Sequence, residues 1–250
     1  MALSLRAALL AFTMLLPFPA LALDPADKPA IEKMVRDYLL ANPEIILEVQ
    51  QALEAKQQAE AAERTRMALE QHGDTIFRSQ NQGTIGPKDA DVQVVEFFDY
   101  NCGFCQRAMN DMNTLLEGDK KVQFVMKELP ILSEGSVEAH RISTAVYRLF
   151  PDQYEKFHNT LLGLQGVKDG NRALRVAQQM ELDIDKINEE AGKPNILAAF
   201  REVNELANQL GINGTPSYVI GDEVLFGALG ADVLREKIEN VRQCGKTVCS

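Results

Sequence analysis

The stretch that decides the fold runs Val94-Val95-Glu96-Phe97-Phe98-Asp99-Tyr100-Asn101-Cys102-Gly103-Phe104-Cys105. Its first half continues an apolar run that begins at Val92, which is typical of a central strand buried on both faces. The segment after Cys102, residues 103–117, carries apolar side chains at helical spacing (Met109, Met112 and Leu116). The stretch therefore predicts a buried strand that leads directly into a helix, with a Cys-x-x-Cys pair at the junction.

The position of this pair predicts a specific chemistry. A helix N-terminus carries a partial positive charge and unpaired amide donors, so a thiolate at Cys102 is stabilised and its pKa falls below the usual value of about 8.5. Cys102 is then the nucleophile in thiol–disulfide exchange, and Cys105, one helical turn further on, resolves the mixed disulfide. Gly103 and Phe104 set the turn geometry and polarity between the cysteines, and we expect them to contact the substrate.

Metal binding is the competing interpretation of the cysteines. A Cys-x-x-Cys pair is half of many zinc sites, and Cys244 and Cys249 would supply the other half. Zinc pairs usually sit in tight knuckles, and 139 positions separate Cys105 from Cys244, so we expect no metal site. For Cys244 and Cys249 we expect a local structural disulfide, with a second redox pair or metal-binding thiols as alternatives. The histidines lie in no motif and are interpreted as surface or satisfied core residues (His72, His140 and His158).

Two other features belong near the cysteine pair. Glu96 interrupts the apolar strand, and burial disfavours its ionised form, so its pKa should rise. It is a candidate relay for the proton of Cys105; the alternative is a structural ion pair with Lys127 on the neighbouring strand. Thr215-Pro216 opens a later strand, where a cis peptide bond would present the Thr215 backbone to an extended substrate. A trans turn proline fits the sequence equally well.

Outward from the pair, the chain continues as a β-α-β unit, a helical stretch, a hairpin and a last helix. We expect a strand at residues 121–129, helices over about 136–210, hairpin strands at 217–220 and 224–226, and a final helix at 231–242. This order predicts an α/β protein with a thioredoxin fold that carries an inserted helical domain, within residues 72–250. Thr75-Ile76-Phe77 is expected to form a short additional strand, followed by a turn-rich segment.

The beginning of the chain is typical of an exported protein. Arg6 precedes the apolar run Ala7 to Phe18 and the small residues Ala20-Leu21-Ala22, which predicts a secretory signal peptide over residues 1–22. Export places the cysteines in an oxidising compartment, where disulfides persist. The net charge of −10 argues against nucleic-acid binding, which needs a basic surface, and no phosphate loop or dinucleotide fingerprint is present. We therefore expect neither a nucleic-acid partner nor a cofactor.

Residues 23–71 form a separate helical segment in this interpretation. Asp27 is the expected N-cap of its first helix, Pro29 lies in the first turn, and Asn42-Pro43 begins a second helix. Apolar stripes run along both helices (Ile31, Met34, Val35, Tyr38, Leu39, Ile46, Val49 and Leu53). Such helices are marginal alone in water, so the stripes must be buried by self-association or against the main domain. The polar stretch 54–71 is interpreted as a connector.

The quoted stretch, together with Gly214-Thr215-Pro216, resembles the DsbA-like periplasmic oxidoreductases. Residues 31–53, with Leu-Ala-Asn-Pro-Glu-Ile at residues 40–45, resemble the ScsC (suppressor of copper sensitivity protein C) group. The resemblance implies a thioredoxin fold with a helical insertion, a cis bond at Pro216 and a buried acid at Glu96. It also implies that the N-terminal segment is an oligomerisation stalk, because ScsC-like proteins with this segment can be trimers that reshuffle wrong disulfides, whereas others are monomers.

The expected function is therefore that of a periplasmic thiol–disulfide oxidoreductase, most directly an isomerase or reductase that acts on unfolded or misfolded exported proteins. The resemblance implies a homotrimer, a membrane redox partner and a link to copper tolerance. Gly103 and Thr215 resemble the corresponding residues of isomerase-type members. A monomeric DsbA-like dithiol oxidase is the first alternative, and a protein that sequesters Cu(I) through its thiols is an alternative of another class.

Overall fold

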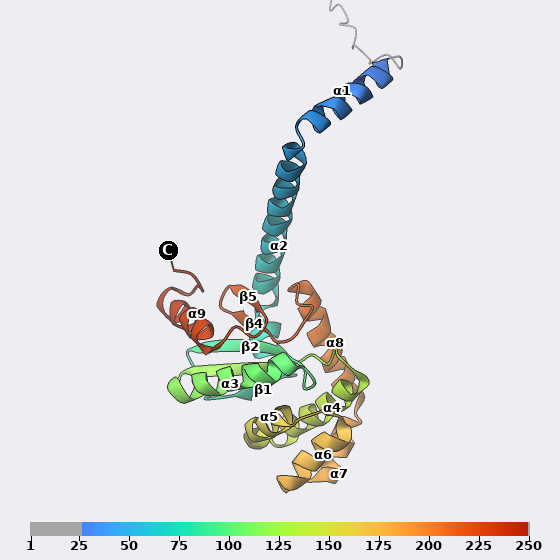
Figure 1. Ribbon diagram of the computed structural model, residues 1–250. Coiled ribbons are helices and arrows are strands. Elements are labelled where there is room, and N and C mark those ends of the chain that lie inside the picture. Colours follow the sequence, from blue (N-terminus) through green and yellow to red (C-terminus); the bar gives the residue numbers. More distant parts are fainter. Residues whose placement is uncertain (1–26, 250) are drawn as a thin grey trace, which may run out of the picture. The chain divides into compact units, whose positions relative to one another are not determined.

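The computed structural model describes residues 27–249, and Figure 1 shows the chain as a ribbon. The expected signal peptide, residues 1–22, lies outside the described residues. The chain divides into two compact units, Met1–Lys56 and Gln57–Ser250. Within residues 27–249 no helix has the length and apolar character needed to cross a membrane.

The first unit, where described, consists of α1 (Lys28–Ala41) and the beginning of α2 (Glu44–Arg78). Asp27 precedes α1 but makes no side-chain capping bond, because its backbone is already helical whereas a capping residue is normally extended. The expected cap is therefore wrong. At the other end of α1, the Asn42 side chain donates to the Tyr38 carbonyl (2.8 Å). The apolar stripes are largely exposed: Met34, Val35, Tyr38, Ile46, Val49 and Leu53 are each 52–70% exposed.

The second unit is built on a five-stranded sheet with the order β1-β3-β2-β4-β5. The strands are β1 (Gly83–Ile85), β2 (Val92–Phe98), β3 (Val122–Glu128), β4 (Ser217–Ile220) and β5 (Glu223–Phe226). β2 is parallel to β3 and antiparallel to β4, so the predicted central strand lies in the middle of the sheet. The strand β1 was not expected; at Gly83 a side chain would collide with the Tyr154 ring, which lies 2.2 Å from an ideal Cβ.

Helices cover the two faces of the sheet with separate cores. Val94 and Phe98 of β2 face α3 (Gly103–Gly118), α9 (Ala231–Cys244) and the inserted helices. Val95 and Phe97 face the opposite side, where they meet the C-terminal part of α2 and α8. The inserted helices span Glu134 to Gln209, close to the expected 136–210 (α4 Glu134–Leu149, η2 Pro151–Gln153, α5 Tyr154–Gly163, α6 Gly170–Gln179, α7 Ile184–Ala191 and α8 Pro194–Gln209). This arrangement is the predicted thioredoxin fold with a helical insertion.

The expected strand at Thr75-Ile76-Phe77 is wrong, because these residues belong to the last turns of α2, after a local break at His72. Tertiary contacts override the β propensity of the three side chains. Ile76 is fully buried in the second core. Lys127 donates to the Thr75 carbonyl (2.6 Å), and the Gln82 side chain donates to the Phe77 carbonyl (3.0 Å), so two carbonyls of the helix end are satisfied.

Candidate active site

Cys102 lies at the point where β2 ends and α3 begins. It is the N-cap of α3, with an extended backbone, and its sulfur accepts a hydrogen bond from the Cys105 amide (3.4 Å). The Cys102 amide donates to the Asp99 carbonyl (3.0 Å), which closes the turn between strand and helix. Neither cysteine is in a disulfide, and Cys102 keeps 7% of its surface exposed whereas Cys105 is fully buried. Cys102 is therefore the member of the pair that an incoming disulfide can reach.

The surroundings of Cys102 favour its thiolate. Its pKa is lowered to about 5, first by a hydrogen bond from the Cys105 thiol, next by the Thr215 side chain, and further by the backbone amides of Cys105 and Phe104, while partial burial acts in the opposite direction. At neutral pH the sulfur is thus ionised. The pKa of Cys105 is raised, chiefly by burial, and also by its hydrogen bond to Cys102 and the negative charge of Glu96.

Glu96 lies on the same face of β2 as Val94 and Phe98 and is 2% exposed. Its pKa is raised to about 8 by burial, and the nearby charges of Asp111 and Cys102 add to the effect. The structural alternative, an ion pair with Lys127, is wrong. Lys127 pairs in register with Phe97, so its side chain points to the opposite face of the sheet, where it binds Thr75 and Gln82.

Thr215 and Pro216 reach the cysteine pair from the start of β4. The Thr215–Pro216 peptide bond is cis, as the resemblance implies. In the thiol form, the Cys102 sulfur donates to the Thr215 carbonyl (3.1 Å). Gly103 and Phe104 lie on the outside of the same turn: Gly103 is exposed, and Phe104 is 57% exposed, with the Arg107 guanidinium 4.3 Å from its ring centre. Of these four residues, Gly103 and Phe104 are exposed and Thr215 is partly buried, whereas Pro216 is buried.

Cys244 and Cys249 lie elsewhere. They are joined to each other by a disulfide, and both are exposed. Arg242, two residues before Cys244, forms an ion pair with Asp119 (2.9 Å), the residue that follows the C-terminus of α3. Since α3 has 16 residues, Asp119 is about 24 Å from the Cys102 end of this helix. The structure thus does not bring the second pair to the redox site, and among the described residues no group of three or more His, Cys, Asp or Glu is placed to hold a metal ion.

Sequence reasoning missed the polar side chains that hold the turn before Cys102. The buried Asp99 carboxylate accepts from the amides of Asn101 (2.8 Å), Ile131 (2.9 Å) and Leu132 (3.1 Å). The Asn101 side-chain oxygen accepts a hydrogen bond from the Lys168 amide (2.7 Å), and the Asn101 side-chain nitrogen donates to the Lys168 carbonyl (2.8 Å). The available signal was the appearance of polar residues directly between an apolar strand and the first cysteine. These bonds fasten loops of the helical insertion to the redox turn.

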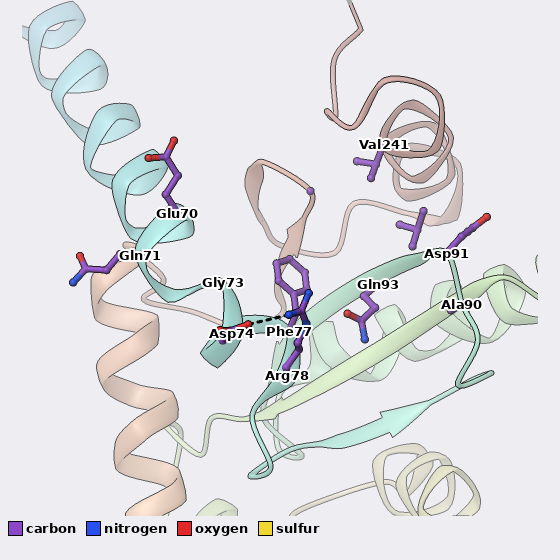
Figure 2. A pocket seen from close by; sticks show the side chains of 12 residues that line it. Glu70, Gln71, Gly73, Asp74, Phe77, Arg78, Ala90, Asp91, Gln93 and Val241 are labelled. Carbon is purple, nitrogen blue, oxygen red and sulfur yellow. Dashed lines mark hydrogen bonds and ion pairs between the residues drawn. The ribbon is translucent and has the colours of Figure 1, made fainter.

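A pocket of about 530 Å³ lies at the other end of β2 (Figure 2). It is lined by the end of α2, where Asp74 and Arg78 form an ion pair (3.1 Å), and by Asp91, Gln93 and Val241. Val92 also lines it, and β2 runs from there over seven residues, about 20 Å, before it reaches the redox turn. None of the candidate site residues takes part in this pocket, so the pocket is separate from the cysteine pair.

Known proteins are similar to most of this chain. Residues 93–239 match the family model "DSBA-like thioredoxin domain", and residues 27–60 match "Copper resistance protein ScsC N-terminal domain". A thioredoxin-like oxidoreductase from Silicibacter pomeroyi is 36% identical, covers 68% of this chain and 98% of its own, and superposes with a TM-score of 0.65. ScsC of Proteus mirabilis in a compact conformation is 28% identical over 87% of this chain and 99% of its own, with a TM-score of 0.65.

Curated relatives are more distant. Disulfide bond formation protein D of Bacillus subtilis is 26% identical over 172 residues, which are 64% of this chain and 77% of that protein. The chain spans only 23% of the length of two Na⁺/H⁺ antiporters NhaA of Salinispora species, which it matches with 24% identity over 149 residues. The family match nevertheless covers more than half of the chain and includes both cysteines of the redox turn. The chain therefore belongs to the DsbA-like thioredoxin-domain family of thiol–disulfide oxidoreductases, with an ScsC-type N-terminal segment.

Proposed function

We propose that this protein is a periplasmic disulfide isomerase or reductase that acts on misfolded exported proteins through Cys102 and Cys105. The observation that carries the proposal is the position of Cys102 at the N-terminus of α3, where its pKa is lowered to about 5 and the residue keeps 7% of its surface exposed. A thiolate is the reactive form in disulfide exchange, so Cys102 is in its reactive form at neutral pH. Gly103, Phe104, Thr215 and Pro216 are the proposed contact residues for the substrate chain.

The reaction begins when the Cys102 thiolate attacks one sulfur of a substrate disulfide. A bond between Cys102 and that sulfur forms, the substrate disulfide breaks, and the second substrate sulfur leaves as a thiolate. In isomerisation, another substrate thiolate attacks the mixed disulfide and regenerates Cys102. In reduction, Cys105 attacks the Cys102 sulfur, the substrate leaves reduced, and a Cys102–Cys105 disulfide remains. A membrane redox partner would then return the pair to the dithiol form.

Glu96 is the proposed relay for the proton of Cys105. Cys105 must lose a proton before it can attack, and its pKa is raised by burial. Glu96 is buried behind the pair, and its own raised pKa lets it take up and release a proton near neutral pH. The carboxylate form of Glu96 accepts the proton from Cys105, and the carboxylic acid returns it when the dithiol is restored.

An oligomeric form would favour isomerase action over simple reduction. The apolar stripes of α1 and α2 face water in the single chain, and the segment that carries them matches the ScsC N-terminal domain. We propose that this segment is a stalk that joins three chains, so that several redox sites face one misfolded substrate. Residues 1–22 are the proposed signal peptide, which would be absent from the mature protein.

A monomeric dithiol oxidase is the second candidate, favoured by one observation. Stabilisation of the Cys102 thiolate stabilises the dithiol form, and this makes the corresponding disulfide a stronger oxidant. A refolding assay distinguishes the isomerase from the oxidase. We expect the reduced full-length mature protein to recover the activity of a scrambled-disulfide ribonuclease, and the C102A variant to be inactive.

The opposite outcome would favour the oxidase. In that case the reduced protein leaves scrambled ribonuclease unchanged, whereas the oxidised protein rapidly introduces disulfides into reduced ribonuclease.

A further inference from the structure

A cluster of buried polar side chains lies directly beneath the redox turn. Its members come from the turn itself, β3, α4 and α5, and each is at most 1% exposed (Tyr100, Glu128, His140, Ser143, Tyr154 and His158). Burying this many polar groups costs free energy unless each is hydrogen-bonded in a defined geometry. The proposed exchange reaction uses none of them, yet Tyr100 is only two residues from Cys102.

The two ring nitrogens of His140 have different partners. Nε2 accepts a hydrogen bond from the Tyr100 amide (3.2 Å). A nitrogen that accepts carries no proton, so the proton of the neutral imidazole is on Nδ1, which is bonded to the Glu128 carboxylate. Glu128 is itself held by Ser143 (2.6 Å) and Tyr154 (3.3 Å). The orientation of the imidazole is thereby fixed from β3.

The bond to Tyr100 restrains one particular peptide group. The Tyr100 amide N–H and the Asp99 carbonyl belong to the same planar unit. His140 binds the N–H side, while the carbonyl side accepts the Cys102 amide (3.0 Å). Rotation of this plane would break both bonds together. His140 therefore lies one peptide plane away from the bond that sets where α3 begins.

We propose that His140 is a positioning residue for Cys102: by holding the Asp99–Tyr100 peptide plane, it keeps the Cys102 sulfur at the N-terminal amides of α3. The inference rests on the proposed redox function of Cys102. Without the hydrogen bond from the Tyr100 amide to His140, the turn gains rotational freedom, the sulfur leaves the Cys105 amide for part of the time, and the thiolate loses stabilisation. His140 touches neither substrate nor sulfur and acts through the backbone alone.

Two isosteric variants test this role, because the side-chain amides of Asn and Gln mimic different ring nitrogens. H140Q keeps an acceptor near the position of Nε2 and can still bind the Tyr100 amide. H140N keeps a donor near the position of Nδ1 and can bind Glu128, but is too short to reach Tyr100. H158F is the matched control, since His158 belongs to the same cluster but contacts the Tyr100 hydroxyl (3.3 Å), not its amide.

The measurement is the pKa of the Cys102 thiol, from the pH dependence of its alkylation rate and of thiolate absorbance, together with the reduction potential. We expect H140N to raise this pKa by about one unit, so that about tenfold less thiolate is present below the pKa. H140Q and H158F should stay near the wild-type value. Chemical unfolding of each variant checks that the Cys102 pKa is measured on folded protein.

The titratable groups around His140 are the same in all the variants except H158F: Glu128 on β3, Tyr100 after β2, and Tyr154 and His158 on α5. Equal Cys102 pKa values in H140N and H140Q would overturn the proposal, as would an equal shift in H158F. If H140N does not fold, H140L takes its place against H140Q with the same readout. Failure of the wild type to exchange disulfides would overturn the proposed function instead, and the pKa comparison would still decide the role of His140.

Discussion

At the scale of single residues, Glu96 combines deep burial with a titration near neutral pH. Its folded pKa of about 8 lies above the ordinary value of 4.5, because burial disfavours the carboxylate. The unfolded chain releases this proton first, so the stabilisation is complete below pH 4.5 and is lost as the pH rises through 8. We expect the wild type to lose about 1.4 kcal/mol per pH unit relative to E96Q over this window.

Urea unfolding of the dithiol form at pH 5, 6, 7 and 8 measures this difference. Subtraction of the E96Q values removes the opposite contribution of Cys102, whose lowered pKa makes stability rise with pH between about 5 and 9. Parallel pH profiles for the wild type and E96Q would show that Glu96 does not titrate in this range, and its role as a proton relay would then be excluded.

Cys105 affects Cys102 before any disulfide forms. The hydrogen bond from the Cys105 thiol is the largest cause of the lowered pKa of Cys102. C105A removes this donor, whereas C105S keeps a hydroxyl donor in the same place. We expect alkylation of Cys102 to titrate near pH 5 in the wild type, slightly higher in C105S, and at least one unit higher in C105A. Identical midpoints in C105S and C105A would mean that a hydrogen bond from the side chain at position 105 does not stabilise the thiolate.

At the scale of elements, the end of α2 is attached to the sheet by a buried lysine. Lys127 is 1% exposed, and its ammonium group donates to the Thr75 carbonyl. Burial lowers the pKa of Lys127 to about 8, so the group is mainly charged at neutral pH. K127M leaves the carbonyl without its donor. We therefore expect the last turn of α2 to open more often, which exposes the bond after Arg78 to trypsin several times faster.

The rate of tryptic cleavage after Arg78 measures this opening. K120M is the matched control, because Lys120 also donates to a helix-end carbonyl, that of Leu116 (2.7 Å), but is exposed and lies at the end of α3. Global stability should change less than the cleavage rate, since an apolar side chain of similar length replaces a buried charge. Equal cleavage rates in the wild type and K127M would show that the buried Ile76, and not Lys127, holds the helix end.

The elements differ in how well the sequence predicts them. The strand at Val92–Phe98, the following helix and the hairpin are marked by local patterns: a continuous apolar run, a Cys-x-x-Cys pair and a Gly-Asp turn. Thr75-Ile76-Phe77 has the composition of a strand, but its conformation depends on Lys127, Gln82 and a core whose members extend from Ala68 to Val219. The site was predictable where residues are adjacent in sequence; the contacts of His140 and Asp99 join segments that only the fold brings together.

At the scale of the whole molecule, the N-terminal segment exposes more apolar surface than is usual for a protein that stays a single chain. In the single chain, Met34, Tyr38, Val49 and Leu53 are each more than half exposed. Exposed apolar area of this extent is normally an interaction surface, because burying it is favourable by about 25 cal/mol per Å². The helices that carry it are also marginal alone, so association would stabilise them as well.

We expect the mature protein to have three times the mass of one chain in light scattering, and a copy that begins at His72 to have the mass of one chain. The double variant V49K/L53K places charges in the apolar stripe, so it should dissociate to single chains while keeping the catalytic unit folded. The control Q50K adds the same charge type beside the stripe, at an exposed polar position, and should remain a trimer. If the wild type and the truncated copy both have the mass of one chain, the stalk does not associate. The monomeric oxidase then becomes the better explanation of the same cysteine pair, because no second redox site faces the substrate.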